Sequence, residues 1–95
     1  MKFLEDLDFS KDKIAEFEEN TPEKLVELIK AQKKLIVENI TFLKELGVTN
    51  YQDIFMKYYD MFLMDNSNFT KIFDQYEKDD LIDKLNKNIN VVEYL

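Results

Sequence analysis

The side chains with the most potential for chemistry in this sequence are carboxylates and lysines. The sequence contains no His and no Cys, so it lacks the usual proton carrier at neutral pH, the usual thiol nucleophile and the usual soft metal ligands. A catalytic site would need paired carboxylates or a lysine in a concave pocket that perturbs their pKa values. No spacing in the sequence marks such a site, so we predict that the protein is not an enzyme and needs no cofactor or metal.

The acidic residues of interest form two groups. The first group is Glu16, Glu18 and Glu19, and the second is Asp74, Glu77, Asp79, Asp80 and Asp83. A calcium loop in "DNSNFTKIFDQYE" is excluded, because the stretch lacks the Gly at the bend and places Phe69 at a ligand position. The remaining alternatives are a solvated acidic surface and a mimic of nucleic-acid phosphates. Small acidic inhibitors made by phages and mobile elements use such mimicry to block a nucleic-acid-binding protein.

The overall charge disfavours binding to nucleic acid. Twenty acidic residues against thirteen basic ones leave a net charge of −7, which opposes approach to a polyanion. All the basic residues are lysines, so no guanidinium is present to make bidentate contacts to guanine or phosphate. Lys24, Lys30, Lys33 and Lys34 lie close together, and they form either a solvated helix face or a small basic patch.

Helical spacing of apolar residues extends through almost the whole chain, with one Gly and one Pro to interrupt it. We therefore predict an all-α fold, a single domain of residues 1–95 with about five helices arranged as degenerate helical hairpins. Two helices are expected to dominate, at 22–46 and 50–64. The ending "NVVEYL" suits a strand as well as a helix, and we expect a helix because no partner strand is evident.

Capping residues indicate where these helices begin and end. Ser10 can cap a short helix, and "NTPEKL" predicts Thr21 as N-cap with Pro22 in the first helical position. Gly47 is placed to end the long helix in a left-handed conformation. Thr49 and Gln52 have the spacing of a capping box for the next helix.

Two phrases of the sequence are nearly the same, "FLEDLDFSKDKI" from Phe3 and "FLKELGVTNYQDI" from Phe42. In each, we expect a helix to end on an apolar residue, the chain to turn, and a Ser or Thr to start the next helix. A third copy, "KNINVVEYL" at 87–95, aligns with "ENITFLKEL" at 38–46. The alternatives are a degenerate repeat, which is compatible with one piece of a longer array, and the ordinary pattern of helix ends.

The first phrase and its continuation, "FLEDLDFSKDKIAEFEENTPEKL", resemble the helical repeat of mitochondrial transcription termination factor–type proteins. The matching positions of the first unit are Leu7, Phe9, Ser10, Ile14, Pro22 and Leu25. Those of the second unit are Leu46, Gly47, Val48, Thr49, Ile54 and Leu63. Asp8 replaces the Gly of the first turn, and Asp60 or a neighbour stands where the second unit would have Pro. The resemblance implies helical-repeat packing and binding to nucleic acid.

Two amides lie within the apolar stripe of the expected helix at 22–46. Gln32 and Asn39 share a heptad series with Leu25 and Leu46. Buried amides need partners, and a polar residue in such a stripe can fix the register of a helix pair. We expect Gln32 and Asn39 either to select a partner helix or to form hydrogen bonds within the core.

The helix expected at 50–64 is apolar around most of its circumference. Its apolar residues are Tyr51, Ile54, Phe55, Met56, Tyr58, Tyr59, Met61, Phe62 and Leu63. A helix of this kind is either central to the core or offers a face to a partner. In the second case Phe55, Tyr58, Tyr59 and Phe62 would contact the partner.

Taken together, the sequence favours a cytoplasmic protein with no membrane segment, which acts as a protein–protein interaction or regulatory module. Its acidic surface favours a basic protein partner, and a homodimer through the aromatic helix is an alternative within this interpretation. The two other interpretations are the acidic mimic and a small nucleic-acid-binding repeat protein. Salt separates the three, because electrostatic contacts weaken as ionic strength rises, whereas apolar contacts persist.

Overall fold

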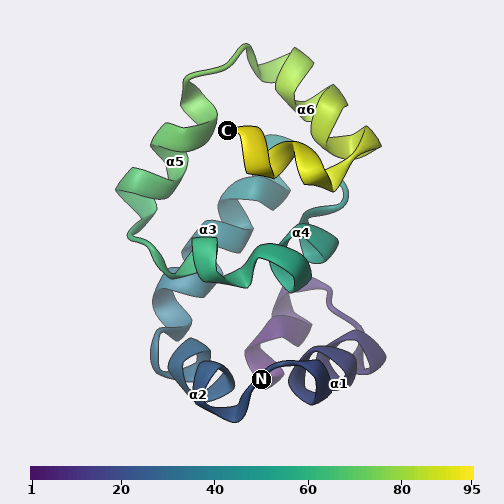
Figure 1. Cartoon of the computed structure of the whole chain (residues 1–95), viewed down its shortest axis with the longest axis vertical. Coiled ribbons are helices and arrows are strands. Elements are labelled where there is room, and N and C mark those ends of the chain that lie inside the picture. Colours follow the sequence, from purple (N-terminus) through teal and green to yellow (C-terminus); the bar gives the residue numbers. More distant parts are fainter.

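A computed structural model describes all residues, 1–95, and contains helices but no strand. The chain forms six α-helices and three short 3-10 helices (η). Figure 1 shows how they are arranged. Their order is η1 (Lys2–Leu7), α1 (Lys11–Asn20), α2 (Glu23–Ala31), α3 (Lys33–Leu46), α4 (Tyr51–Tyr58), η2 (Tyr59–Leu63), α5 (Asn66–Asp74), α6 (Lys78–Lys87) and η3 (Ile89–Tyr94). The all-α prediction is confirmed, and about five helices was too few. Every helix falls short of the length and hydrophobicity that a membrane crossing requires.

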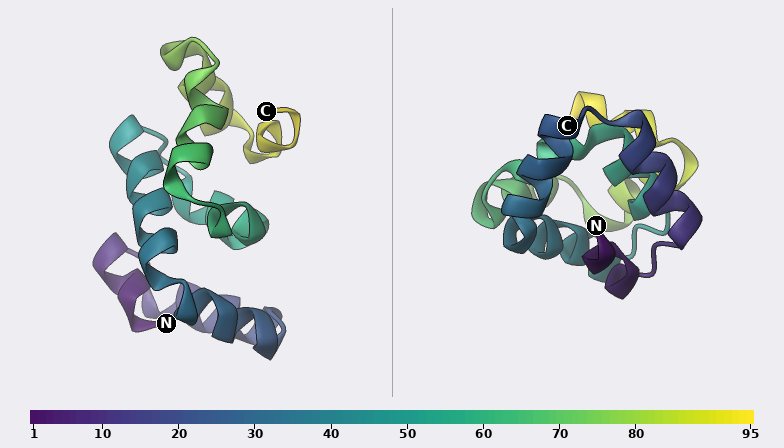
Figure 2. Two further views of the ribbon diagram at one scale, coloured as in Figure 1. Left: turned by 90° about the vertical axis from the view of Figure 1, so that its left-hand side faces the viewer. Right: turned by 90° about the horizontal axis from the view of Figure 1, so that it is seen from below.

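The helix predicted at 22–46 is interrupted at Gln32, which has φ −103° and ψ 29°. A straight helix of that length would extend about 37 Å. Instead α2 turns across the lower end of α3, as Figure 2 shows. The turn buries Val26 and Ile29 of α2, with Ile29 completely enclosed in the core. The burial of these two aliphatic side chains stabilises the fold. This gain exceeds the stability that one more turn of regular helix would contribute, so the bend is favoured.

The helix predicted at 50–64 is also divided. Regular α-helix ends at Tyr58, whose φ of −120° and ψ of 38° turn the chain into the 3-10 helix η2. This turn directs Phe62 into the core. The centroid of its ring lies 5.3 Å from that of Phe55 and 5.0 Å from that of Phe69. All three rings are fully buried. Aromatic packing therefore decides where this helix stops.

Two of the predicted caps form and two do not. Ser10 accepts a hydrogen bond from the Lys13 amide at 3.1 Å, and Gly47 ends α3 with φ 107°. Thr21 is buried after the end of α1, and Pro22 precedes α2 without a side-chain cap. The capping box is also wrong, because Gln52 donates instead to the carbonyl oxygen of Asp8 at 3.1 Å.

Two contacts with α6 explain why the capping box does not form. The N-cap of α4 is Asn50, and its side-chain amide donates to the carbonyl oxygen of Leu85 at 2.7 Å. The Thr49 amide donates to the side chain of Asn86 at 2.9 Å. The backbone of Thr49 and the side chain of Asn50 therefore bind α6, and these tertiary contacts replace local capping.

The first two repeated phrases form the same turn. In each, the residue in the left-handed conformation donates its amide three residues back, Asp8 to Glu5 and Gly47 to Lys44. The following residue, Phe9 or Val48, donates five residues back, at 3.2 Å in both copies. This is the Schellman arrangement of a helix end. The third phrase does not share it, because residues 87–95 comprise the end of α6 and η3, whereas residues 38–46 lie within α3.

The core is one cluster of nineteen buried apolar side chains, to which every helix contributes. One completely buried polar side chain, that of Asn39, joins it. Asn39 of α3 donates hydrogen bonds to the carbonyl oxygens of Phe62 and Met64, each at 2.9 Å. Its side-chain oxygen also accepts one from the side-chain amide of Asn66 at 3.0 Å. The amide of Asn39 thereby satisfies the backbone where η2 ends and α5 begins.

Candidate protein-interaction groove

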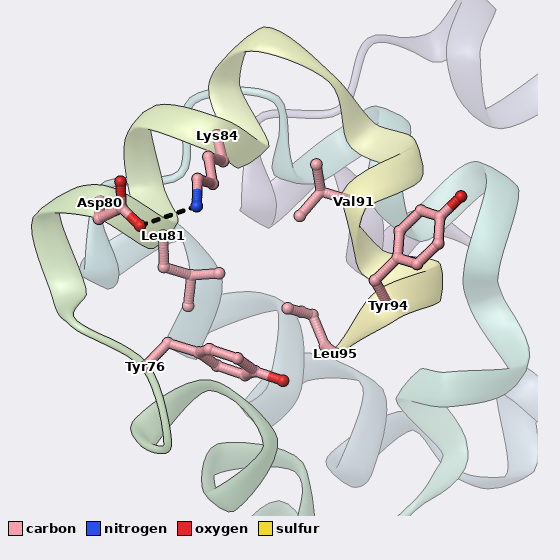
Figure 3. Close-up of a pocket in the computed structure, with 7 residues that line it drawn as sticks. All are labelled: Tyr76, Asp80, Leu81, Lys84, Val91, Tyr94 and Leu95. Carbon is pink, nitrogen blue, oxygen red and sulfur yellow. Dashed lines mark ion pairs between the residues drawn. The ribbon is translucent and has the colours of Figure 1, made fainter.

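Only three large apolar side chains are exposed in this protein, Leu28 at 42%, Tyr76 at 40% and Tyr94 at 85%. Two of them, Tyr76 and Tyr94, border the same hollow, which has a volume of about 260 Å³. Figure 3 shows the seven residues that line it, Tyr76, Asp80, Leu81, Lys84, Val91, Tyr94 and Leu95. The hollow therefore combines an apolar floor with two accessible phenol rings.

A second hollow of about 250 Å³ adjoins the first, since Tyr76 and Leu81 line both. Leu46, Phe73, Asp74 and Lys78 complete its lining. We call the two hollows together the Tyr76 groove. The groove combines apolar lining residues with an exposed tyrosine at each end of the first hollow and charged side chains at the edge, a composition typical of protein interfaces.

The turn between α5 and α6 places Tyr76 at the groove. Phe69 and Phe73 anchor α5 in the core, and α5 ends at Asp74, two residues before Tyr76. Glu77 then caps α6, because its carboxylate accepts hydrogen bonds from the amides of Asp79 at 3.3 Å and Asp80 at 2.7 Å. Tyr76 lies between the two helices, and its ring stays partly in solvent.

The other wall of the groove is η3, which α4 holds in place. The hydroxyl of Tyr58 donates to the Glu93 carboxylate at 2.6 Å and lies 3.0 Å from the side-chain oxygen of Asn90. The hydrogen bond to Glu93 raises the pKa of Tyr58 to about 12, with smaller contributions from desolvation and from the negative charge of Glu93. Val92 is buried beneath. The wall carrying Val91 and Tyr94 is thus fixed.

The rim of the groove carries five acidic residues and three lysines, Lys78, Lys84 and Lys87, so its net charge is negative. Asp74 and Asp80 line the two hollows, and Glu77, Asp79 and Asp83 lie on the same turn and helix. Lysines neutralise two of the five, in the pairs Asp80–Lys84 at 3.0 Å and Asp83–Lys87 at 2.9 Å. Asp74 and Asp79 have no ion-pair partner within the chain. Cations of a partner could therefore pair with them.

The other predicted acidic group lies far from this rim. Glu16, Glu18 and Glu19 belong to α1, which Figure 1 shows at the lower end of the molecule, opposite the turn between α5 and α6. Glu18 pairs with the N-terminal ammonium at 2.6 Å. The two acidic groups therefore do not combine into one continuous face.

The two predicted amides have different surroundings. Asn39 is completely buried and hydrogen-bonded within the core, which matches the intramolecular alternative. Gln32 is exposed at the bend between α2 and α3. Its predicted place in an apolar stripe is wrong, because the bend ends the heptad series of a continuous helix.

The aromatic residues predicted to contact a partner lie in or against the core. Phe55 and Phe62 are fully buried, so neither has surface to offer, and the expected apolar partner face on this helix is wrong for both. Tyr58 and Tyr59 are partly buried, and Tyr59 packs edge-to-face on Phe17 with 5.4 Å between ring centroids. The alternative of a central core helix fits these positions.

Sequence reasoning missed the groove residues Tyr76, Tyr94 and Val91. Tyr76 has helical spacing from Phe69 and Phe73, which predicts a place on the same helix, although α5 ends before it. One signal was present. In "DQYEKDD" a single aromatic residue stands among four acids and a lysine. A single aromatic side chain in so polar a turn indicates an exposed contact.

No protein-family model, curated protein or solved structure matches this chain. No group of three or more acidic residues comes together in a way that could hold a metal ion. The function of the Tyr76 groove therefore has to be inferred from its shape, its exposed tyrosines and its charge.

Proposed function

We propose that the protein is a non-catalytic protein–protein interaction or regulatory module whose Tyr76 groove binds a basic amphipathic segment of a partner protein. An apolar side chain of that segment would enter the groove between Tyr76 and Tyr94. Lysines or arginines beside it would pair with Asp74 and Asp79. The acidic surface predicted from the sequence keeps its role in this proposal, and the groove replaces the aromatic helix as the apolar contact.

The observation that carries the proposal is the exposure of Tyr76 and Tyr94 on either side of one apolar hollow. Elsewhere on the molecule aromatic rings are buried or partly buried, so these two are exceptions. Tyrosines at the centre of an interface contribute much of its binding energy, because a rigid ring covers a large area and loses little entropy. The excess of carboxylates over lysines at the rim favours a cationic partner over an anionic one.

An acidic mimic of nucleic acid is the alternative. It would use the exposed carboxylates of the turn and of α6 in the place of phosphates. The ion pairs of Asp80 and Asp83 with lysines interrupt that row, which is why we prefer the groove. A role in nucleic-acid binding, implied by the resemblance to mitochondrial transcription termination factor–type repeats, would instead use the exposed lysines Lys24, Lys30, Lys33 and Lys34.

The proposal can be tested with a labelled helical peptide that carries leucines on one face and lysines on the other. Fluorescence anisotropy should show binding to the wild-type chain with a Kd of about 10–100 µM, as expected for a small, transient contact. The same peptide with glutamates in place of its lysines should not bind. Binding by the lysine peptide should persist at moderate salt, because the leucine contact is apolar.

Two matched double variants separate local from overall charge. Asp74→Lys with Asp79→Lys should weaken peptide binding by about tenfold or more, since both changes are at the rim. Glu16→Lys with Glu19→Lys changes the net charge equally but lies on α1, and it should alter the Kd by less than about twofold. Equal losses in both variants would contradict a specific groove. Binding of duplex DNA or RNA by the wild-type chain would favour the nucleic-acid alternative.

A further inference from the structure

We infer that the basic segment received by the Tyr76 groove is α2 and the start of α3 of a second copy of this chain, so that copies associate head to tail. This inference rests on the proposed function of the groove. The occupant is identified by an exposed leucine and a group of lysines on the same molecule. The third exposed apolar side chain, Leu28, lies in a stretch of α2 and the start of α3, residues 23–34, that carries four exposed lysines and two glutamates. These features complement the groove in shape and in charge.

Leu28 is the apolar part of this complementary surface. It lies on α2, 42% exposed, while its neighbours Val26 and Ile29 face the core. The side chain at the same helical face one turn earlier is Lys24, which is exposed. A leucine that projects from a helix beside a lysine is the pattern that the groove is suited to receive.

The charge of this surface is opposite to that of the rim. Lys24, Lys30, Lys33 and Lys34 are all exposed along α2 and the start of α3, against two glutamates, Glu23 and Glu27, in the same stretch. One of the four, Lys30, is paired within the chain, to Glu27 at 3.7 Å. The other three have no ion-pair partner within the chain, as Asp74 and Asp79 have none at the groove.

The two surfaces lie toward opposite ends of the molecule. Figure 1 shows α2 at the lower end of the long axis and the turn carrying Tyr76 at the upper end. A contact between two different surfaces is heterologous and leaves one of each free on the resulting pair. Addition of further copies therefore continues until a ring closes or a filament forms.

The size of the molecule limits the strength of this contact. Its two shorter Cα extents are 25 and 22 Å, so an end-to-end contact is confined to a small cross-section, at the low end of the interface sizes found in stable complexes. The charge of −7 on each copy adds a general repulsion. Association should accordingly be reversible and dependent on concentration, and it should be visible near about 1 mM.

Complementation between two variants tests the inference. Leu28→Glu removes the projecting side chain but keeps the groove, and Tyr76→Lys blocks the groove but keeps α2. Sedimentation velocity should show wild-type oligomers that grow with concentration, and each variant alone should remain a monomer. An equimolar mixture should form a one-to-one dimer and nothing larger, because only one compatible pair of surfaces remains. Ala15→Glu, at an exposed position on α1, should assemble as the wild type does.

Several results would overturn the inference. These are a wild-type chain that stays monomeric at about 1 mM, single variants that assemble normally, or a mixture that stays monomeric. Should Tyr76→Lys not fold, Tyr94→Lys, at an 85% exposed position, takes its place. The lysine peptide distinguishes the two claims. If it binds the groove while the chain stays monomeric, the proposed function stands and self-association is excluded.

Discussion

Asp8 and Gly47, 39 residues apart, end two helices in the same left-handed backbone conformation, with φ of 70° and 107°. Their side chains differ, and so does the backbone strain that a positive φ causes in each. Aspartate is tolerated in this region better than most residues with a Cβ, whereas glycine adopts it without penalty. The carboxylate of Asp8 is also bound by Lys44 at 2.6 Å. The two turns therefore share a backbone conformation, and an ion pair links them.

Gly47→Ala should lower the free energy of unfolding by about 1–2 kcal/mol, as urea denaturation would measure. A Cβ there would meet Ile82 at 3.8 Å, an ordinary contact, so the loss comes from backbone conformation alone. Asp8→Gly relieves strain and removes an exposed ion pair, and it should change stability by less than about 1 kcal/mol. An equal loss in both variants would contradict this interpretation of the turns.

Asn39→Leu should lower the free energy of unfolding by about 2–4 kcal/mol, because the carbonyl oxygens of Phe62 and Met64 lose their donor inside the core. Gln32→Leu is the matched control. It occupies the position one heptad earlier, and the bend leaves it exposed, so its effect should be within about 0.5 kcal/mol. Thermal or urea unfolding followed by circular dichroism would compare them. A large loss from the Gln32 variant would contradict the bend.

Phe62→Ala should cost about 3–5 kcal/mol, which approaches the total stability of a domain of this size. The Phe62 ring lies between Phe55 and Phe69 and has no exposed surface. Tyr94→Ala also removes an aromatic ring, but one that is 85% exposed, so it should cost less than about 0.5 kcal/mol. Urea midpoints distinguish the two. A folded, stable Phe62 variant would show that this residue is not part of the core.

The Tyr58–Glu93 hydrogen bond should make stability depend on pH in the alkaline range. The pKa of Tyr58 rises from 10.0 to about 12 in the folded protein, so the folded state holds this proton more tightly. The contribution is complete below about pH 10 and is lost as pH rises toward 12. Tyr58→Phe lacks it, so the stability difference between wild type and variant should shrink over this interval.

Absorbance of tyrosinate provides an independent measurement of the same bond. One tyrosine of the wild-type chain should titrate near pH 12, and the Tyr58→Phe spectrum should lack that late step. A wild-type chain whose tyrosines all titrate near pH 10 would show that Glu93 does not hold this hydroxyl. The wall of the groove formed by η3 would then have a weaker anchor than the structure indicates.

The fold class, two helix ends and the similarity of the first two turns could be predicted from local patterns. Ser10 and Gly47 act through their own backbone neighbours, so their roles depend on a few adjacent residues. The bends at Gln32 and Tyr58 could not be predicted in this way. They depend on where Ile29 and Phe62 find buried surroundings, and those are provided by helices distant in sequence.

The same reason explains why the candidate site was only partly foreseen. Carboxylates such as Asp74 and Asp79 are exposed wherever the helices pack, so the acidic surface was predictable from composition. The accessible rings were not, because the burial of an aromatic residue depends on tertiary packing. Of two similar residues, Phe73 is buried in the core, and Tyr76, three positions later, is left at the surface.

The most direct test of the central claim is to map where the lysine–leucine peptide binds, by titrating it into the 15N-labelled chain and following amide chemical shifts. We predict that the shifts change most around Tyr76, Leu81 and Tyr94, with little change at Glu16 and Glu19 on α1. Changes spread over both acidic groups, or centred on α1, would contradict the Tyr76 groove as the site of recognition.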